Sequence, residues 1–256
     1  MNWNRRTSST SEPTSARRVV VFGQTLIAAC LAFYLDLPIS RSMVQGQALA
    51  SAPAAGPDSE GGVSRAAIPQ RALRSIHRLL QLIEDFGRPP AVIAVSLAIL
   101  LCAGSRRGVA FRIAAVGLIP GIAVDVLKLC VARTRPRNFD FQGNVFDTFQ
   151  GLFPGTKGGY PLQSWPSGHS AVAVGFALAL AAVFPRGRWL FVALAGLVML
   201  QRIESCAHFP SDTLFSAAVA YAIFMVIFGR GPIGRWFERL ESRWAVEPAE
   251  GIRQED

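Results

Sequence analysis

A short polar stretch interrupts the apolar second half of the chain and carries groups that can do chemistry. It is QRIESCAHFPSD, residues 201–212. His208 and Asp212 are four residues apart, so on a helix the Asp212 carboxylate can accept the Nδ1–H of His208 and leave Nε2 with a free lone pair. A carboxylate that orients a neutral imidazole makes it an effective base or nucleophile. We therefore predict His208 as a reactive group and Asp212 as its orienting partner.

A second cluster, KLCVARTRP, lies at the end of another apolar run. Lys128 and Arg135 are seven residues apart, close to two helical turns, so we expect both side chains on one helix face before Pro136 ends the helix. Two such cations can hold an anion together. The alternative is that both extend from the membrane interface into water.

A third cluster, WPSGHS, directly precedes an apolar run. A helix that begins near Ser167 directs free backbone N–H groups and the positive end of its dipole outward, which suits an anion. Gly168 permits close approach of the backbone, and His169 adds a titratable group. The alternative is an ordinary serine N-cap beside an incidental histidine.

The three clusters together favour phosphoryl chemistry. Three cations, Lys128, Arg135 and Arg202, suit the charge on the equatorial oxygens of a phosphoryl group in transfer. Two histidines can divide the work, one attacking phosphorus and the other protonating the leaving oxygen. No grouping of Asp, Glu, Cys and His predicts a metal site, and no cofactor is expected. A channel or transporter would place polar groups at mid-span, whereas these lie at helix ends.

This pattern of K-x6-RP, PSGH and R-x5-H-x3-D resembles the signature of the type 2 phosphatidic acid phosphatase (PAP2) superfamily, which includes vanadium haloperoxidases. The layout is similar to its integral-membrane lipid phosphatase branch. The resemblance implies that His208 forms a phosphohistidine, Asp212 orients it and His169 is the general acid. It also implies a phosphate-binding set of Lys128, Arg135, Ser167, Gly168 and Arg202. The sequence departs from the family at Gln201, where a serine is common, and we expect altered positioning there.

The composition indicates a membrane protein. Of 256 residues, 51% are hydrophobic and 17% charged, with a mean hydropathy of +0.32. The net charge of +9 does not indicate nucleic acid, because the arginines are spread among short connections. We expect an all-α bundle of six transmembrane helices with a PAP2/haloperoxidase-like catalytic core. The spans are residues 19–35, 91–104, 109–131, 171–184, 190–200 and 214–228.

The distribution of charge favours both termini in the cytoplasm, with segment 1–18 and the tail 229–256 inside. Segment 37–88 is then an outer loop, and residues 68–87 within it have the spacing of an amphipathic helix lying at the membrane surface. A cleaved signal peptide is the alternative for the first run. Residues 1–256 are expected to form one membrane-embedded domain in the inner (plasma) membrane, with the active site facing the periplasm.

Several side chains around the motifs have open assignments. Asp125 can pair with Lys128, and Glu204 can pair with Arg202 or face water. The long connection 133–166 is rich in aromatic residues, which suits either a lid over the substrate or an interfacial anchor.

The predicted function is a metal-independent lipid phosphatase acting on a phosphate monoester or pyrophosphate. Lipid A, undecaprenyl pyrophosphate, phosphatidylglycerophosphate and phosphatidic acid are the candidate substrates. A phosphotransferase that passes the phosphoryl group to an acceptor other than water is the alternative.

Overall fold

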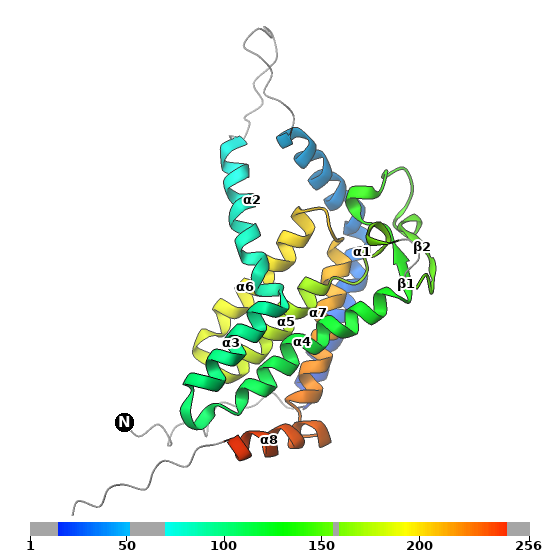
Figure 1. Ribbon diagram of the computed structural model, residues 1–256. Helices are drawn as coiled ribbons and strands as arrows, with labels where there is room; N and C mark the ends of the chain where they lie inside the picture. Colours follow the sequence, from blue (N-terminus) through cyan, green and yellow to red (C-terminus); the bar gives the residue numbers. More distant parts are fainter. Residues whose placement is uncertain (1–14, 52–69, 156–158, 245–256) are drawn as a thin grey trace, which may run out of the picture.

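The computed structural model describes residues 15–51, 70–155 and 159–244 (Figure 1). Most of segment 1–18, part of the predicted outer loop and the end of the predicted tail lie outside these residues. The described chain is helical apart from one small hairpin. Its helices are α1 Ser15–Ser51, α2 Gln70–Glu84, α3 Pro89–Cys102, α4 Val109–Lys128, α5 Gly168–Val183, α6 Arg188–Glu204, α7 Pro210–Ile227 and α8 Pro232–Trp244.

Short elements connect these helices. The hairpin pairs β1 Val131–Arg133 antiparallel with β2 Phe149–Leu152. Single 3₁₀ turns lie at Asp85–Gly87, Gly104–Arg106, Pro136–Asn138, Val145–Thr148, Tyr160–Leu162 and Pro185–Gly187. The connection 133–166 is therefore ordered by a hairpin and several turns over its described part.

Each of the six predicted apolar runs contains a helix, although the run 109–131 is helical only to Lys128 and ends in β1, and six membrane spans are not confirmed. Among the described residues, α1, α4 and α7 are long and apolar enough to cross a membrane, and α2 with α3 makes a fourth if the bent pair counts as one span. Helix α5 is apolar but has only 16 residues, a rise of about 24 Å against a hydrocarbon core of about 30 Å. Helix α6 has 17 residues.

Helix α5 is the centre of the bundle and contacts α4, α6 and α7. Its residues Ala173, Phe176 and Ala177 are buried. Gly175 lets α4 approach closely, because a Cβ on it would collide with the Val116 carbonyl oxygen. Small residues at helix contacts are typical of membrane bundles, where close backbone packing drives association.

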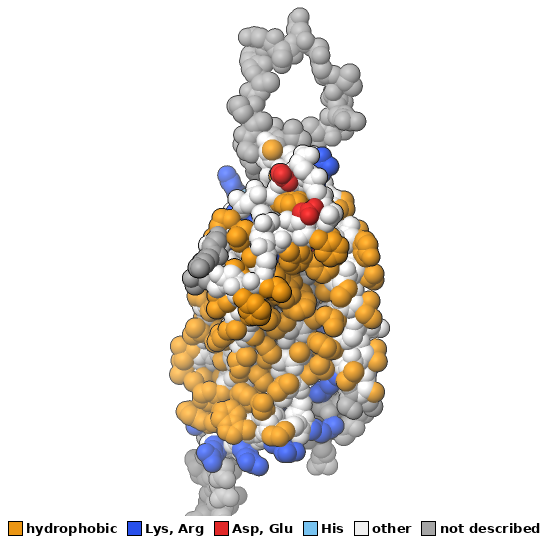
Figure 2. Space-filling model, turned by 90° about the vertical axis from the view of Figure 1, so that its right-hand side faces the viewer, with side chains coloured by type: hydrophobic (Ala, Val, Ile, Leu, Met, Phe, Trp, Pro, Cys, Tyr) orange, Lys and Arg blue, Asp and Glu red, His pale blue; other side chains and the backbone are white. Residues whose placement is uncertain are grey.

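The outer surface is strongly apolar. Figure 2 shows a broad band of hydrophobic side chains, with Lys and Arg along its lower rim and both signs of charge near the upper end. Exposed Ile27 and Leu31 on α1 and Ile122 and Val126 on α4 are among the large apolar side chains that face outward. Such a surface is suited to contact with lipid chains.

The predicted surface helix at 68–87 is instead part of the bundle over its described length. Helix α2 meets α3 at a bend of 60° and packs against α6. Leu80 is buried, Ile83 packs against the α5–α6 core, and the Nδ1 of His77 lies 3.0 Å from a carboxylate oxygen of Glu204. The C-terminal part of the apolar stripe therefore contacts protein, whereas Leu79 and Leu82 on the same helix face outward. The predicted tail contains α8, which lies across the lower end of the bundle (Figure 1).

The two ends of the bundle differ. The start of α1 and the end of α7 lie together, since Arg18 donates to the Phe228 carbonyl at 3.4 Å. Helix α8 covers the same end (Figure 1). The three polar clusters lie at the opposite end, where α4 stops, α5 begins, α6 stops and α7 begins.

Candidate active site

Four helix ends carry the predicted site residues. Lys128 is the last residue of α4, His169 is in the first turn of α5, Arg202 is in the last turn of α6, and Asp212 is in the first turn of α7. The first and third motifs are held together by Arg135, whose Nη1 donates to the Ala207 carbonyl at 3.0 Å. Sequence segments 80 residues apart thus form one polar centre.

The first and second motifs meet at Lys128. Its Nζ lies 3.4 Å from the position that a Cβ on Gly168 would occupy, at the N-terminus of α5. It also pairs with Asp125 at 2.9 Å, as expected. The ammonium group therefore lies beside free backbone N–H groups, which is a favourable arrangement for an anion.

Ser167 is the N-cap of α5. Its hydroxyl accepts from the Ser170 amide at 3.5 Å and from the Ser170 hydroxyl at 2.9 Å, and its side chain is fully buried. Its backbone N–H donates to the Ser216 hydroxyl at 2.7 Å. The start of α5 is thereby fixed against α7. A phosphate contact by Ser167 stays a prediction.

The expected shared helix face of Lys128 and Arg135 is wrong. Helix α4 stops at Lys128, and the chain enters β1 well before Pro136, because pairing with β2 satisfies its backbone groups. Arg135 is buried, donates to the carbonyl oxygens of Tyr160, Ala207 and Gln163, and lies 3.7 Å over the Tyr160 ring. Burial lowers the pKa of Arg135 to about 10, so it remains a cation at neutral pH.

The direct His208–Asp212 hydrogen bond is also absent. His208 precedes α7, so the two residues do not share a helix, and Nδ1 lies 3.8 Å from the nearest Asp212 oxygen. The Nδ1–H instead donates to the Ser164 carbonyl at 2.5 Å. The Ser164 hydroxyl donates to Asp212 at 2.7 Å, as does the Phe209 amide at 2.8 Å. Ser164 therefore links the two residues, and Asp212 caps the start of α7.

A buried ionic network that the sequence did not reveal supports Asp212. Arg133 is fully buried and donates to Asp212, to Ser211 at 2.9 Å and to Asp36 at 2.7 Å. The Thr148 hydroxyl accepts from Arg133 Nε at 3.0 Å. The signals in the sequence were a lone acid at the end of the first apolar run and an arginine two residues before Arg135. Neither indicates its partner.

A second residue outside the motifs reaches the centre. Glu84, at the end of α2, forms an ion pair with Arg202 at 2.8 Å, so it takes the partner role considered for Glu204. The same Oε1 lies 3.3 Å from Nε2 of His169. Glu204 pairs with His77 instead. Glu84 fell within the predicted surface helix, where an acidic residue has no special meaning.

His208 has the electrostatic state that a nucleophile needs. Its burial lowers the pKa to about 4; Asp212 opposes this effect and Arg135 reinforces it. The imidazole is therefore neutral at pH 7, and since Nδ1 carries the proton given to Ser164, Nε2 keeps its lone pair. Among the described residues no group of three or more His, Cys, Asp and Glu side chains is arranged to hold a metal ion.

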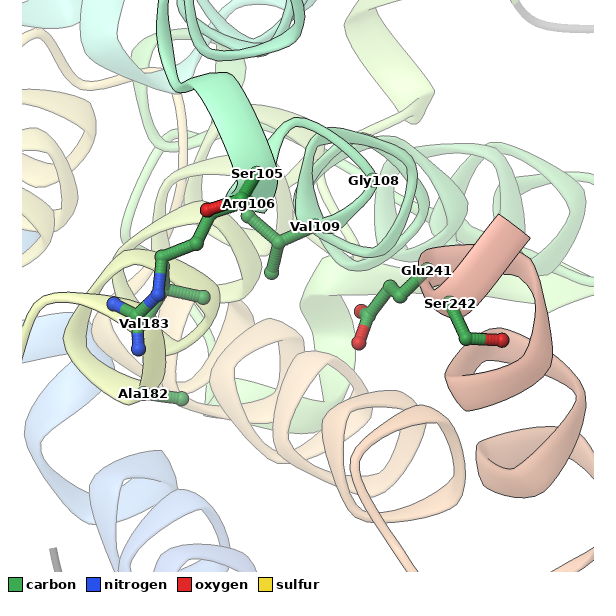
Figure 3. A pocket seen from close by; sticks show the side chains of 8 residues that line it. All are labelled: Ser105, Arg106, Gly108, Val109, Ala182, Val183, Glu241 and Ser242. Atoms are coloured by element: carbon green, nitrogen blue, oxygen red, sulfur yellow. The ribbon is translucent and has the colours of Figure 1, made fainter. Parts of the chain in front are cut away.

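Two hollows lie away from this centre. One, of about 410 Å³, lies at the opposite end between the Gly104–Arg106 turn, the end of α5 and α8, and Figure 3 shows Arg106 and Glu241 lining it. The other, of about 670 Å³, is mainly apolar and lies between α1 and the Val145–Thr148 turn. Phe33 and Phe149 line it and also flank the Arg133 guanidinium.

Comparison with known proteins agrees with this geometry. Residues 108–231 match the model of the PAP2 superfamily, and this stretch contains all three motifs. This match, over slightly less than half of the chain, confirms the resemblance noted in the sequence.

Two curated relatives bear the name lipid A 1-phosphatase. The protein from Rhizobium etli is 33% identical over 124 residues, which cover 44% of this chain and 51% of the relative. The protein from Rhizobium johnstonii is 35% identical over 98 residues, which cover 38% of each. The chain thus aligns with about half of one relative and less of the other. No solved structure matches the chain significantly.

Proposed function

We propose that the chain is a membrane phosphatase that removes a phosphoryl group from a lipid through a phosphohistidine on His208. The observation that carries the proposal is the neutral, buried His208 held in the same centre as Lys128, Arg135 and Arg202. The match to the PAP2 model and the names of the two relatives support the same class of reaction.

The proposed reaction has two steps. His208 Nε2 attacks phosphorus, the bond from phosphorus to the lipid oxygen breaks, and His169, which enters the step as the imidazolium, supplies a proton to that oxygen. Burial lowers the pKa of His169 to about 4, so binding of the anionic phosphate must raise this pKa for His169 to act as the acid. Water then attacks the phosphohistidine, gives up a proton to His169, and phosphate leaves with His208 restored to neutral. Lys128, Arg135, Arg202 and the Gly168 amide would bind the oxygens, whose charge they stabilise in both transition states.

The proposed substrate is a phosphorylated lipid, with lipid A carrying a 1-phosphate first among the candidates because both relatives are named for that substrate. The centre lies at helix ends, where a headgroup can enter while acyl chains stay in the bilayer. Undecaprenyl pyrophosphate, phosphatidylglycerophosphate and phosphatidic acid remain in the proposed class. We propose an inner-membrane location with this end facing the periplasm, on the charge distribution given above.

The test is phosphate release by the purified protein from a panel of these four lipids. We expect wild-type turnover and no turnover by His208→Ala. Wild type incubated with radiolabelled substrate and quenched in alkaline denaturant should carry a base-stable, acid-labile label that is absent from His208→Ala. Full activity of His208→Ala would contradict the nucleophile assignment. Transfer of label to an added lipid or sugar hydroxyl without free phosphate would favour the phosphotransferase.

A further inference from the structure

Glu84 lies where α2, α5 and α6 meet, although it belongs to none of the three motifs. Its side chain is only 14% exposed. The single oxygen Oε1 lies 2.8 Å from Arg202 Nη1, 3.3 Å from His169 Nε2 and 2.9 Å from Arg88 Nη2. One carboxylate thus contacts a proposed phosphate-binding arginine and the proposed general acid.

The bend between α2 and α3 fixes Glu84 in this place. The turn Asp85–Gly87 packs on α5 and α6, and a Cβ on Gly87 would lie 2.7 Å from the His169 carbonyl oxygen and 2.9 Å from a methyl carbon of Val198. Only glycine allows so close an approach. The Phe86 ring stacks 5.0 Å from Phe176 of α5. Close packing on both sides therefore holds Glu84 at the centre.

The hydrogen bonds of Arg202 show which of its edges is engaged. The Glu84 Oε1 forms an ion pair with Nη1 at 2.8 Å, and the amide oxygen of Gln201 accepts a hydrogen bond from the same Nη1 at 3.3 Å. Arg202 is 93% buried, and its Nε has no hydrogen-bond partner among the described residues. A buried donor without a partner is costly, so this Nε is available to an anionic oxygen.

We propose that Glu84 is a positioning residue, which with Gln201 holds Arg202 so that its Nε–Nη2 edge faces two oxygens of the bound phosphoryl group. A guanidinium is a rigid planar fork, so fixing Nη1 sets the direction of the opposite edge. The inference rests on the proposed function and gives Gln201, the departure from the family pattern, a definite role. Because Glu84 and Gln201 hold Arg202 before the phosphoryl group binds, less conformational entropy is lost on binding.

The test measures binding of orthovanadate to the purified protein, together with kcat and KM for phosphate release. We expect Glu84→Ala to weaken orthovanadate binding and lower kcat/KM, each by about tenfold or more, because Arg202 loses its fixed direction. Glu84→Gln keeps an oxygen that accepts from Arg202, so its values should be intermediate. If the unfolding temperature shows that Glu84→Ala does not fold, Glu84→Gln replaces it as the test variant.

Asp85→Ala is the matched control. Asp85 is the next residue, is mainly exposed and pairs only with Arg88 among the described residues, so the variant should behave as wild type. Orthovanadate binding by both Glu84 variants as tight as in wild type, or tighter, would make Glu84 a competing anion and overturn the inference. A wild type that neither binds orthovanadate nor releases phosphate from any lipid would overturn the proposed function, and the inference with it.

Discussion

Asp36 on α1 and Arg133 on β1 form a fully buried ion pair with an Oδ2–Nη2 distance of 2.7 Å, although 97 residues separate them in the chain. Asp36 also accepts from the backbone N–H of Ser211 at 2.9 Å. Arg133 in turn pairs with Asp212, beside the proposed nucleophile. Helix α1, which lies outside the region that matches the family model, is thereby connected to the reactive centre.

We predict that Asp36→Asn destabilises the protein by about 3 kcal/mol, because it leaves part of a buried arginine charge uncompensated. The measurement is the denaturant midpoint in detergent. Asp85→Asn, which breaks a mainly exposed pair with Arg88, should cost less than about 1 kcal/mol. Equal, small effects of the two variants would show that the α1 pair contributes little.

A second prediction concerns Ser164, whose two groups serve different residues. Ser164→Ala removes the hydroxyl that donates to Asp212 but keeps the carbonyl that accepts from His208. We expect it to lower kcat/KM less than tenfold, in line with one lost hydrogen bond of about 1 kcal/mol. Asp212→Ala should lower kcat/KM far more, because it also leaves Arg133 with one carboxylate fewer. An Asp212→Ala variant as active as Ser164→Ala would contradict this order.

The helices were predicted from the sequence, and so was the end of the bundle at which the three motifs meet. Long apolar runs bounded by charges have few other structures available, so each run became a helix. The motifs carry Lys128, His169 and His208 at helix ends, which is a local property. These features depend on neighbours in the sequence and can be predicted from it.

The sequence did not predict the partners of the charged groups. The four-residue spacing of His208 and Asp212 suggested a helical pair, but Pro210 begins α7 after the histidine, so the spacing has no helical meaning. Nothing in the sequence near Asp36 or Glu84 indicates Arg133 or Arg202 as a partner, since these arginines are distant in the chain. Such contacts depend on tertiary packing, which periodicity does not report.

A third prediction tests the packing at the centre of the bundle. Gly175→Ala should destabilise the protein by about 1–3 kcal/mol, because its methyl group would collide with the Val116 backbone carbonyl. Gly196→Ala on α6 is the control, since nothing lies within 4 Å of the added methyl. We expect it to be neutral or slightly stabilising. Unfolding temperatures in the same detergent compare the two, and equal values would contradict the close α4–α5 contact.

A fourth prediction concerns metal removal. The charges of Lys128, Arg135 and Arg202 take the place that Mg²⁺ has in many phosphoryl-transfer sites. We therefore expect EDTA to leave phosphate release unchanged. Orthovanadate should inhibit competitively, because its five-coordinate form resembles the transition state. Strong inhibition by EDTA, reversed by adding a divalent cation, would instead indicate a metal-dependent enzyme.

The last prediction concerns pH. His208 attacks as the neutral imidazole, and its burial lowers the pKa to about 4. Protonation removes the lone pair, so the acid limb of kcat/KM should lie near pH 4 and not in the ordinary histidine range, while the need for protonated His169 gives a separate fall at higher pH. The measurement is kcat/KM against pH, divided by the fraction of substrate phosphate in its reactive ionisation state, which is titrated separately because phosphate monoesters ionise near pH 6.

An Arg135 variant tests the physical cause of the low pKa of His208. Its positive charge lowers the pKa of His208, although less than burial does. Arg135→Gln should therefore move the acid limb to higher pH while also weakening phosphate binding, since it removes a cation. A wild-type acid limb near pH 6.5 would mean that His208 is solvated during turnover, or that another group limits the reaction. If the wild-type acid limb lies near pH 4 and Arg135→Gln moves it to higher pH, the limb reports the protonation of the buried His208 imidazole.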